Sequence, residues 1–206
     1  MSDPSSEEQN GRRVFVKGED TAQSTSRKIS MAALPNSKQG FPVRVMAKRA
    51  AAVNVAVKAL AIATKRLSED NMHIVAVPSF RDNRNEVSLV VEDMEKLKAN
   101  SLLTTDISHY AVGSKTDPKM TAGAIASSAR EGHASSVTGI GADAVFNAIR
   151  SIAIAREYLK DKADNVDLFV KAEFVEVTLD GKEGQEDRTS TAVKMTAFLH
   201  QGQIDL

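Results

Sequence analysis

The sequence lacks the residues on which several classes of protein depend. It contains no cysteine, which excludes a disulfide framework and thiolate metal sites. Its four histidines are scattered rather than clustered as zinc ligands are, so we expect no metal site: His73, His109, His133 and His200. Tryptophan is absent and aromatic residues make up 4% of the chain, which argues against a platform of stacked bases. With no leader pattern and no apolar run of membrane-spanning length, we expect an intracellular protein, cytoplasmic or nuclear, without membrane contact.

The net charge is zero, yet the charges are unevenly distributed along the 206 residues. Residues 1–11 carry −3, residues 12–98 carry +7 and residues 99–206 carry −4. A basic first half and an acidic second half predict either surfaces with different partners or two halves that attract each other. The apolar content of 42% suffices for one large domain or two small ones.

An internal duplication divides the chain. Residues 52–63 (AVNVAVKALAIA) and 144–155 (AVFNAIRSIAIA) are identical at six of twelve positions. The match continues, after a shift of two residues, from residues 71–76 to 165–170. Fixed-period similarity is the signature of repeated structural units. We predict two units, at 12–95 and 108–202, a linker at 96–107 and a disordered tail at 1–11.

Each unit is predicted to run strand, helix, strand, helix, strand, strand, which is an α+β fold. In the second unit, Asp117 and Pro118 form a helix start and Gly132 a left-handed stop. The alternation of apolar residues slips after Phe174, which predicts a bulge there. The expected elements of this unit are strands at 109–113 and 135–139, a helix at 142–160 and a hairpin ending at Leu199. Weaker signals give the first unit strands at 13–17 and 41–46, helices at 21–34 and 50–67, and a hairpin of 74–80 with 87–91.

Residues 138–149 (TGIGADAVFNAI) resemble the glycine-rich turn that binds a dinucleotide. Such a site needs several parallel strand–helix–strand units. Here the helix is followed by an antiparallel hairpin, and the duplicate at 45–53 has no glycine. We therefore expect no cofactor. The glycines instead allow a strand and a helix to meet closely, although a helix N-terminus can also hold a nucleic-acid phosphate.

The element order and a set of motifs resemble the Alba superfamily, and the second unit resembles its stage V sporulation protein S family. The resemblance covers nearly all of residues 110–198, while the first unit is similar to a diverged copy and matches poorly over 18–40. The motifs are Val112 to Pro118, Ala122 to Ala126, Arg130 to Gly132, Ile140 to Ala142, Ala144 to Arg156, Val166 to Leu168, and Arg188 to Lys194. The resemblance implies two tandem Alba-like β-α-β-α-β-β units, which can pair as an intramolecular pseudo-dimer through hairpins and second helices or join a homo-oligomer or protein partner.

For the archaeal relatives the resemblance also implies nucleic-acid binding, through the two strand–helix turns and the long hairpin. Basic residues there would neutralise RNA or DNA phosphates without reading sequence. The matching candidates are Lys17, Arg44, Lys48, Arg49, Arg81 and Arg84 in the first unit, and Lys115, Lys119, Gly139, Gly141, Lys182 and Arg188 in the second.

Two functions are therefore expected from the sequence. The first is a non-enzymatic nucleic-acid-binding protein, because no nucleophile–base arrangement or phosphate-binding loop is present. The second is a protein-interaction or scaffold module, because the loop at 180–188 holds four acids and two bases and would repel phosphate.

Overall fold

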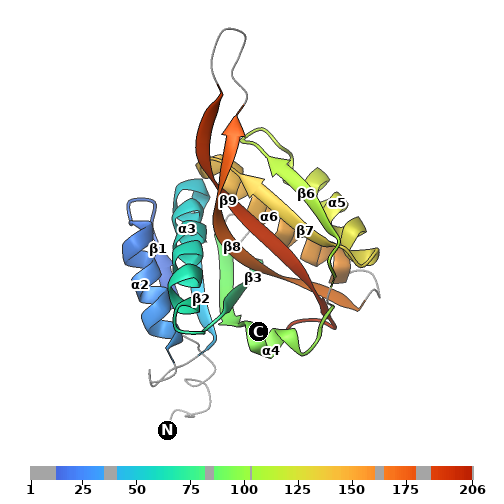
Figure 1. Ribbon diagram of the computed structural model, residues 1–206, viewed down its shortest axis with the longest axis horizontal. Coiled ribbons are helices and arrows are strands. Elements are labelled where there is room, and N and C mark those ends of the chain that lie inside the picture. Colours follow the sequence, from blue (N-terminus) through green and yellow to red (C-terminus); the bar gives the residue numbers. More distant parts are fainter. Residues whose placement is uncertain are drawn as a thin grey trace.

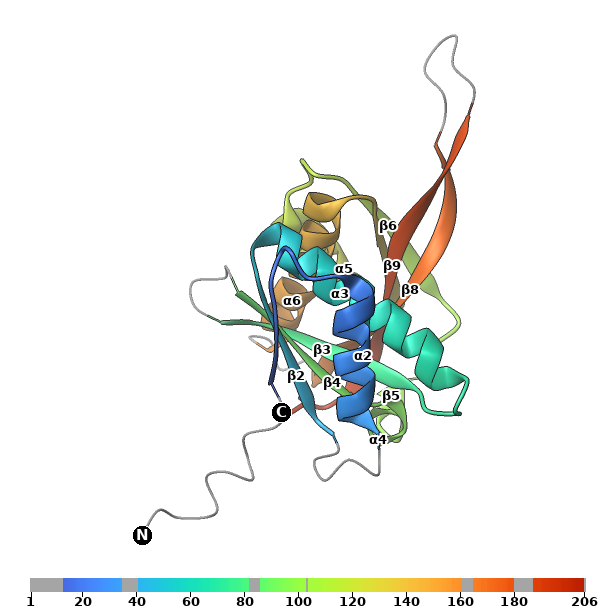
Figure 2. The same ribbon diagram turned by 90° about the vertical axis from the view of Figure 1, so that its left-hand side faces the viewer.

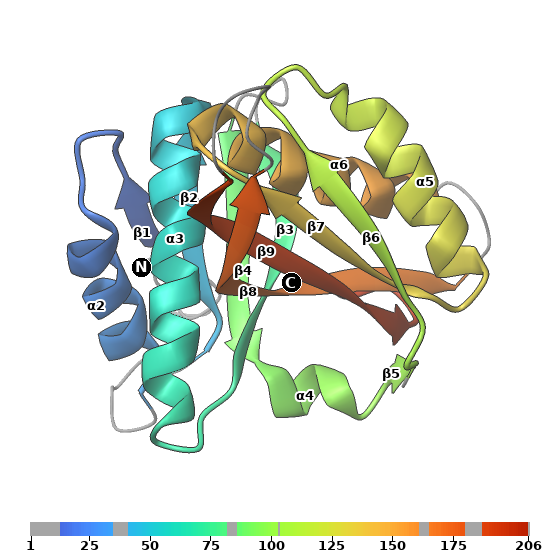
Figure 3. The same cartoon turned by 45° about the horizontal axis from the view of Figure 1, so that its top comes forward.

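One nine-stranded sheet contains all the strands of the described residues. The computed structural model describes residues 13–34, 41–81, 86–102, 104–160, 165–179 and 187–205. The strands follow the order β1-β2-β4-β3-β8-β9-β7-β6, with β5 paired to β9. The helices follow one another in the order α2, α3, α6 and α5, each in contact with the next (Figure 3). The predicted tail at 1–11 lies outside the described residues.

The first unit has the predicted order of elements. Its chain runs through β1 (Arg13–Val16), α2 (Ala22–Ala33), β2 (Val43–Lys48), α3 (Arg49–Ser68), β3 (Ile74–Arg81) and β4 (Glu86–Asp93). The side chain of Thr21 caps α2 by accepting a hydrogen bond from the Ser24 amide. Alanines make up much of the buried side of α3, which lets α2 and α6 pack closely on either side of it (Figure 1).

The second unit repeats this order. Its chain runs through β6 (Ile107–Val112), α5 (Pro118–Arg130), β7 (Ala134–Gly139), α6 (Ala142–Lys160), β8 (Val166–Leu179) and β9 (Arg188–Gln201). Asp117 caps α5 through the Lys119 amide, and Pro118 begins the helix, as the sequence predicts. Gly132 follows α5 at φ +82°, which confirms the predicted left-handed stop.

The two units pair about a pseudo-twofold axis. Antiparallel strands β3 and β8 meet at Ala76 and Val170. These two residues correspond to each other in the duplication, since Asn71 and Asn165 precede them by the same number of residues and both adopt left-handed backbone, at φ 57° and 50°. A residue that pairs with its own counterpart is the mark of an isologous interface. The contact of α3 with α6 completes an intramolecular pseudo-dimer.

The segment predicted to be a linker contains secondary structure. A short helix α4 (Met94–Lys98) is capped by Asp93, and β5 (Ser101–Leu102) adds to β9. Leu97 of α4 packs with Phe169 and Ile204 in a second core, on the sheet face away from the four long helices. Figure 2 shows α4 at the lower end of the molecule, next to the C-terminal end of α3. The connection therefore covers part of the outer face.

The predicted bulge after Phe174 is wrong. Strands β8 and β9 pair residue for residue from Val166 opposite Gln201 to Leu179 opposite Arg188. The apolar residues change face because the strands leave the helical layer and continue as a two-stranded projection, at the top of Figure 1. There Phe174 is 41% exposed, and Val175, Val177 and Leu179 occupy the other face. We call residues 174–179 and 188–193 the arm.

Candidate nucleic-acid interface

The turns that join the first strand to the first helix are built alike in both units. The Lys17 amide donates to Oδ2 of Asp20 at 2.8 Å, and the Gly113 amide donates to Oγ1 of Thr116 at 2.9 Å. Lys17 and Gly113 also accept equivalent backbone bonds from Asp20 and Thr116. The turns match without insertion, although the sequence similarity over 18–40 is weak. The two turns therefore have the same hydrogen-bonded geometry, although their side chains differ.

A cluster of cations lies at one edge of the first half of the sheet. Parallel strands β1 and β2 end together, because Val16 pairs with Ala47, so Lys17 and Lys48 follow at neighbouring positions. In the strand register, Glu86 of β4 lies between Lys48 of β2 on one side and Arg81 of β3 on the other. Arg49 begins α3 at the same edge. We call Lys17, Lys48, Arg49 and Arg81 the basic edge; Arg81 is placed by its backbone alone.

Arg49 holds a backbone conformation that disfavours it. Its φ is +69°, and the corresponding residue of the second unit is Gly141 at φ +87°. The left-handed region costs a non-glycine residue about 1–2 kcal/mol. Arg49 also stands at the N-terminus of a 20-residue helix that has no side-chain cap and no acid in its first turn, where a cation is unfavourable. Its exposed side chain accordingly sits where neither the backbone nor the helix dipole favours it.

We expect Arg49→Gly to raise the free energy of unfolding by about 1 kcal/mol, because glycine removes the left-handed strain. Urea unfolding followed by circular dichroism would measure the change. Arg49→Ala is the matched control, since it removes the same charge and keeps the strain. Equal stability of the two variants would show that the charge, and not the backbone, is responsible.

The glycines of the second unit serve the strand–helix junction. A Cβ on Gly139 would lie 3.0 Å from the carbonyl carbon of Ala144, so this glycine allows β7 to approach α6. After α6 the chain enters β8, which is separated from β7 by antiparallel β9. The parallel neighbour of β7 is β6, which precedes it in the chain, and the strand that follows α6 does not lie beside β7 as the dinucleotide fold requires.

The second-unit turns carry charges of both signs. Lys115 and Lys119 are exposed at the β6–α5 turn, beside exposed Asp117, and Asp143 follows Gly141. The Asn147 side-chain amide donates to the carbonyls of Gly113 and Ser114, which joins this turn to the start of α6. In Figures 1 and 2 the strand–helix turns of both units and the arm point to the same side. The candidate surface is therefore shared, with its cationic excess on the first unit.

Four predicted cations lie away from the basic edge or outside the described residues. Arg44 is the second residue of β2, opposite Val90, and lines a small cavity with Ser79 and Arg156. Arg188 is at the far end of the arm, opposite Leu179. Arg84, Lys182 and most of the acidic loop lie outside the described residues.

A buried ion pair lies beside the pseudo-twofold axis and was not predicted from the sequence. Arg156 of α6 is 4% exposed and Asp167 of β8 is fully buried. Their side chains meet twice at 2.7 Å, from Nε to Oδ1 and from Nη2 to Oδ2, and Nη1 donates to the Pro78 carbonyl at 2.7 Å. The sequence did contain one indication of this ion pair. Asp167 is a charged residue among the apolar residues Val166 and Leu168, and it corresponds to His73 in the first copy of the duplication.

Among the described residues, no group of three or more metal-binding acids and histidines comes together. Within the same residues, none of the helices combines the length and the apolarity needed to cross a bilayer.

The family model of stage V sporulation protein S (SpoVS) matches the chain over two segments, residues 21–91 and 109–200. The chain belongs to the SpoVS family. The two segments coincide with the two halves of the pseudo-dimer, so the first half is a SpoVS-type unit as well as the second. Membership associates the chain with a sporulation-related family of small proteins.

Proposed function

We propose that this SpoVS-family protein binds RNA or DNA through phosphate contacts that do not depend on sequence, and that the basic edge is the main contact. The observation that carries the proposal is the register that gathers cations from β1, β2, β3 and the start of α3 at one edge. Phosphate contacts from lysine and arginine supply most sequence-independent affinity. The proposal assigns a binding role and no catalytic step.

Arg49 supports the same surface. A residue whose backbone and electrostatic position are both unfavourable points to a role that outweighs local stability. A phosphate at this helix N-terminus would interact with the helix dipole and with the guanidinium together. The edge is also open, since Lys17, Lys48 and Arg49 are all exposed.

We expect the double variant Lys48→Glu/Arg49→Glu to weaken binding to a mixed-sequence 20-base-pair DNA, and to single-stranded RNA of the same length, by at least about tenfold at 50 mM salt. Two lost phosphate contacts should also reduce the slope of log affinity against log salt by about 1.8 for DNA. Fluorescence anisotropy of labelled oligonucleotides between 50 and 200 mM salt would measure both quantities.

The matched control is Arg27→Glu/Lys28→Glu, which reverses the same charges at consecutive exposed residues in the middle of α2. If both double variants lose the same affinity, the binding follows total charge and the basic edge has no special role. If the unaltered protein shows no binding at 50 mM salt, the proposal fails. The protein-interaction alternative would then be favoured, on the arm, whose half-buried Val175, Val177 and Leu179 extend beyond the length of the first hairpin.

A further inference from the structure

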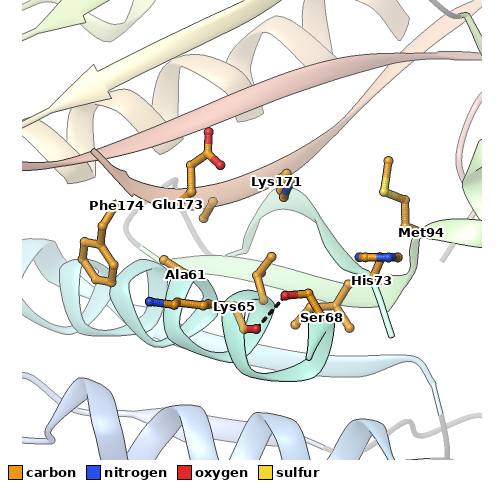
Figure 4. A pocket seen from close by; sticks show the side chains of 11 residues that line it. Ala61, Lys65, Ser68, His73, Met94, Lys171, Glu173 and Phe174 are labelled. Atoms are coloured by element: carbon orange, nitrogen blue, oxygen red, sulfur yellow. Dashed lines mark hydrogen bonds between the residues drawn. The ribbon is translucent and has the colours of Figure 1, made fainter. Parts of the chain in front are cut away.

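A cavity of about 560 Å³ lies between the second half of α3 and strand β8. Its size is that of a small-molecule site. Figure 4 shows α3 on one side and β8 on the other, with His73 and Met94 at one end and Phe174 at the opposite end. The lining residues are Ala61, Thr64, Lys65, Ser68, His73, Ile74, Met94, Lys171, Ala172, Glu173 and Phe174.

The pseudo-twofold axis relates this cavity to the site of the buried ion pair. Thr64 corresponds to Arg156 in the duplicated helix, and His73 corresponds to Asp167. Ala172 takes the place of Pro78, whose carbonyl accepts from Arg156. The guanidinium of Arg156 therefore fills this position in one half, and no guanidinium occupies the equivalent position in the other half.

The loss of the arginine leaves the space open. In the filled half, the remaining cavity at Val77, Ser79, Arg156 and Lys160 measures about 220 Å³. In the open half, the Thr64 hydroxyl donates to the Leu60 carbonyl of its own helix and does not reach across. The opening reaches the surface, since Lys65 and Phe174 are exposed, and a concave, mostly apolar pocket of this size is the usual form of a small-molecule site.

The charges around the cavity select an anion. Lys65 and Lys171 line it together with the imidazole of His73. Glu173 is the one carboxylate among the described lining residues; it turns away from α3 in Figure 4 and pairs with Lys194 at 2.6 Å. Ala61, Ile74, Ala172, Met94 and Phe174 provide an apolar wall. A ligand that fits needs an anionic head and an apolar body.

We propose that this cavity binds a small organic anion, with a carboxylate, sulfonate or phosphate near Lys65 and Lys171 and an aromatic or aliphatic body along the apolar wall that runs between Phe174 and Met94. The site is separate from the basic edge, because it is built by the second half of α3 and by β8. The proposal therefore stands whether or not the protein binds nucleic acid.

The test uses 8-anilinonaphthalene-1-sulfonate, a sulfonate on an aromatic body, as the probe for the full-length protein. We expect its fluorescence to rise to saturation at one site and the Met94 methyl resonance, assigned with Met94→Leu, to shift along the same curve. Lys65→Glu should weaken binding at least about tenfold, since it replaces attraction by repulsion. Arg66→Glu makes the same charge change at the next residue, which does not line the cavity, and should alter the affinity less than about twofold.

The double variant Thr64→Arg/His73→Asp rebuilds the ion pair of the other half and should abolish probe binding by filling the space. Circular dichroism confirms that this variant is folded; if it does not fold, the comparison of Lys65→Glu with Arg66→Glu decides alone. A probe that binds without moving the Met94 resonance, or that loses equal affinity in the Lys65 and Arg66 variants, overturns the proposal.

Discussion

Arg156→Met is expected to lower the free energy of unfolding by about 3–5 kcal/mol, the range for breaking one side of a buried ion pair. The guanidinium makes three hydrogen bonds of 2.7 Å, two to the Asp167 carboxylate and one to the Pro78 carbonyl. Methionine has the length to fill the space and cannot make those bonds. The Asp167 carboxylate would still accept hydrogen bonds from the Leu168 and Ile204 amides. It would, however, be fully buried without its counter-ion.

The effect extends to the pairing of the two units, because Pro78 belongs to the first unit and Arg156 to the second. For a chain of this length, each kcal/mol at the midpoint corresponds to about 2–4 °C. Thermal and urea unfolding would therefore show a loss of roughly 10 °C. Arg66→Met, at an exposed arginine of α3, should change stability by less than about 0.5 kcal/mol.

The double variant Arg156→Met/Asp167→Leu separates the ion pair from the packing around it. Removing both charges avoids an uncompensated carboxylate, so the double variant should be more stable than Arg156→Met alone. A single-variant loss below about 1 kcal/mol would mean that water or a neighbouring group compensates Asp167.

The duplication made much of the fold predictable from the sequence. Two copies of one pattern fixed the order of elements in both halves, and Asp117, Pro118 and Gly132 fixed the ends of α5 because each acts on the backbone locally. Pairing through the hairpins and second helices followed from the resemblance. These features depend on local chemistry or on comparison within the chain, and both are visible in one sequence.

Other features depended on neighbours that the sequence does not reveal. The left-handed backbone at Arg49 carries no glycine to indicate it and becomes apparent only beside Gly141. The change of face after Phe174 suggested a bulge, because the pattern records burial and cannot tell a slipped register from a strand that outruns its helices. The segment at 96–107 is short and has no clear period, and α4 forms at its start because Leu97 packs against Phe169 of the sheet.

The basic edge was partly predictable. Lys17, Lys48, Arg49 and Arg81 were selected because they flank predicted turns, and the register places them together. Arg44 was selected by its charge and the resemblance, but it lies near the start of β2, at the opposite end from Lys48, and lines a different cavity. The cavity on α3 could not be predicted, since it results from what Thr64 and His73 fail to fill.

Phe169→Ala is expected to lower the free energy of unfolding by about 3–5 kcal/mol, the usual cost of truncating a buried aromatic side chain. Phe169 is 1% exposed and stacks on Phe198 with ring centroids 5.6 Å apart. It joins Val75 and Val77 of the sheet to Leu97 and Ile204, which come from the connection and the C-terminal segment. Without the ring, α4 and the segment around Ile204 would lose most of their contact with the outer face.

This loss has a local signature that global unfolding lacks. The Ile204 amide donates to Oδ2 of Asp167, so its hydrogen exchange should accelerate in Phe169→Ala, together with the amides of α4, before those of α3 and α6 change. Phe174→Ala is the matched control on the same strand, where the ring is 41% exposed, and should cost less than about 1 kcal/mol. If exchange at α4 stays the same while stability falls, the connection is held by its pairing through β5 and by the Asp93 cap rather than by this ring.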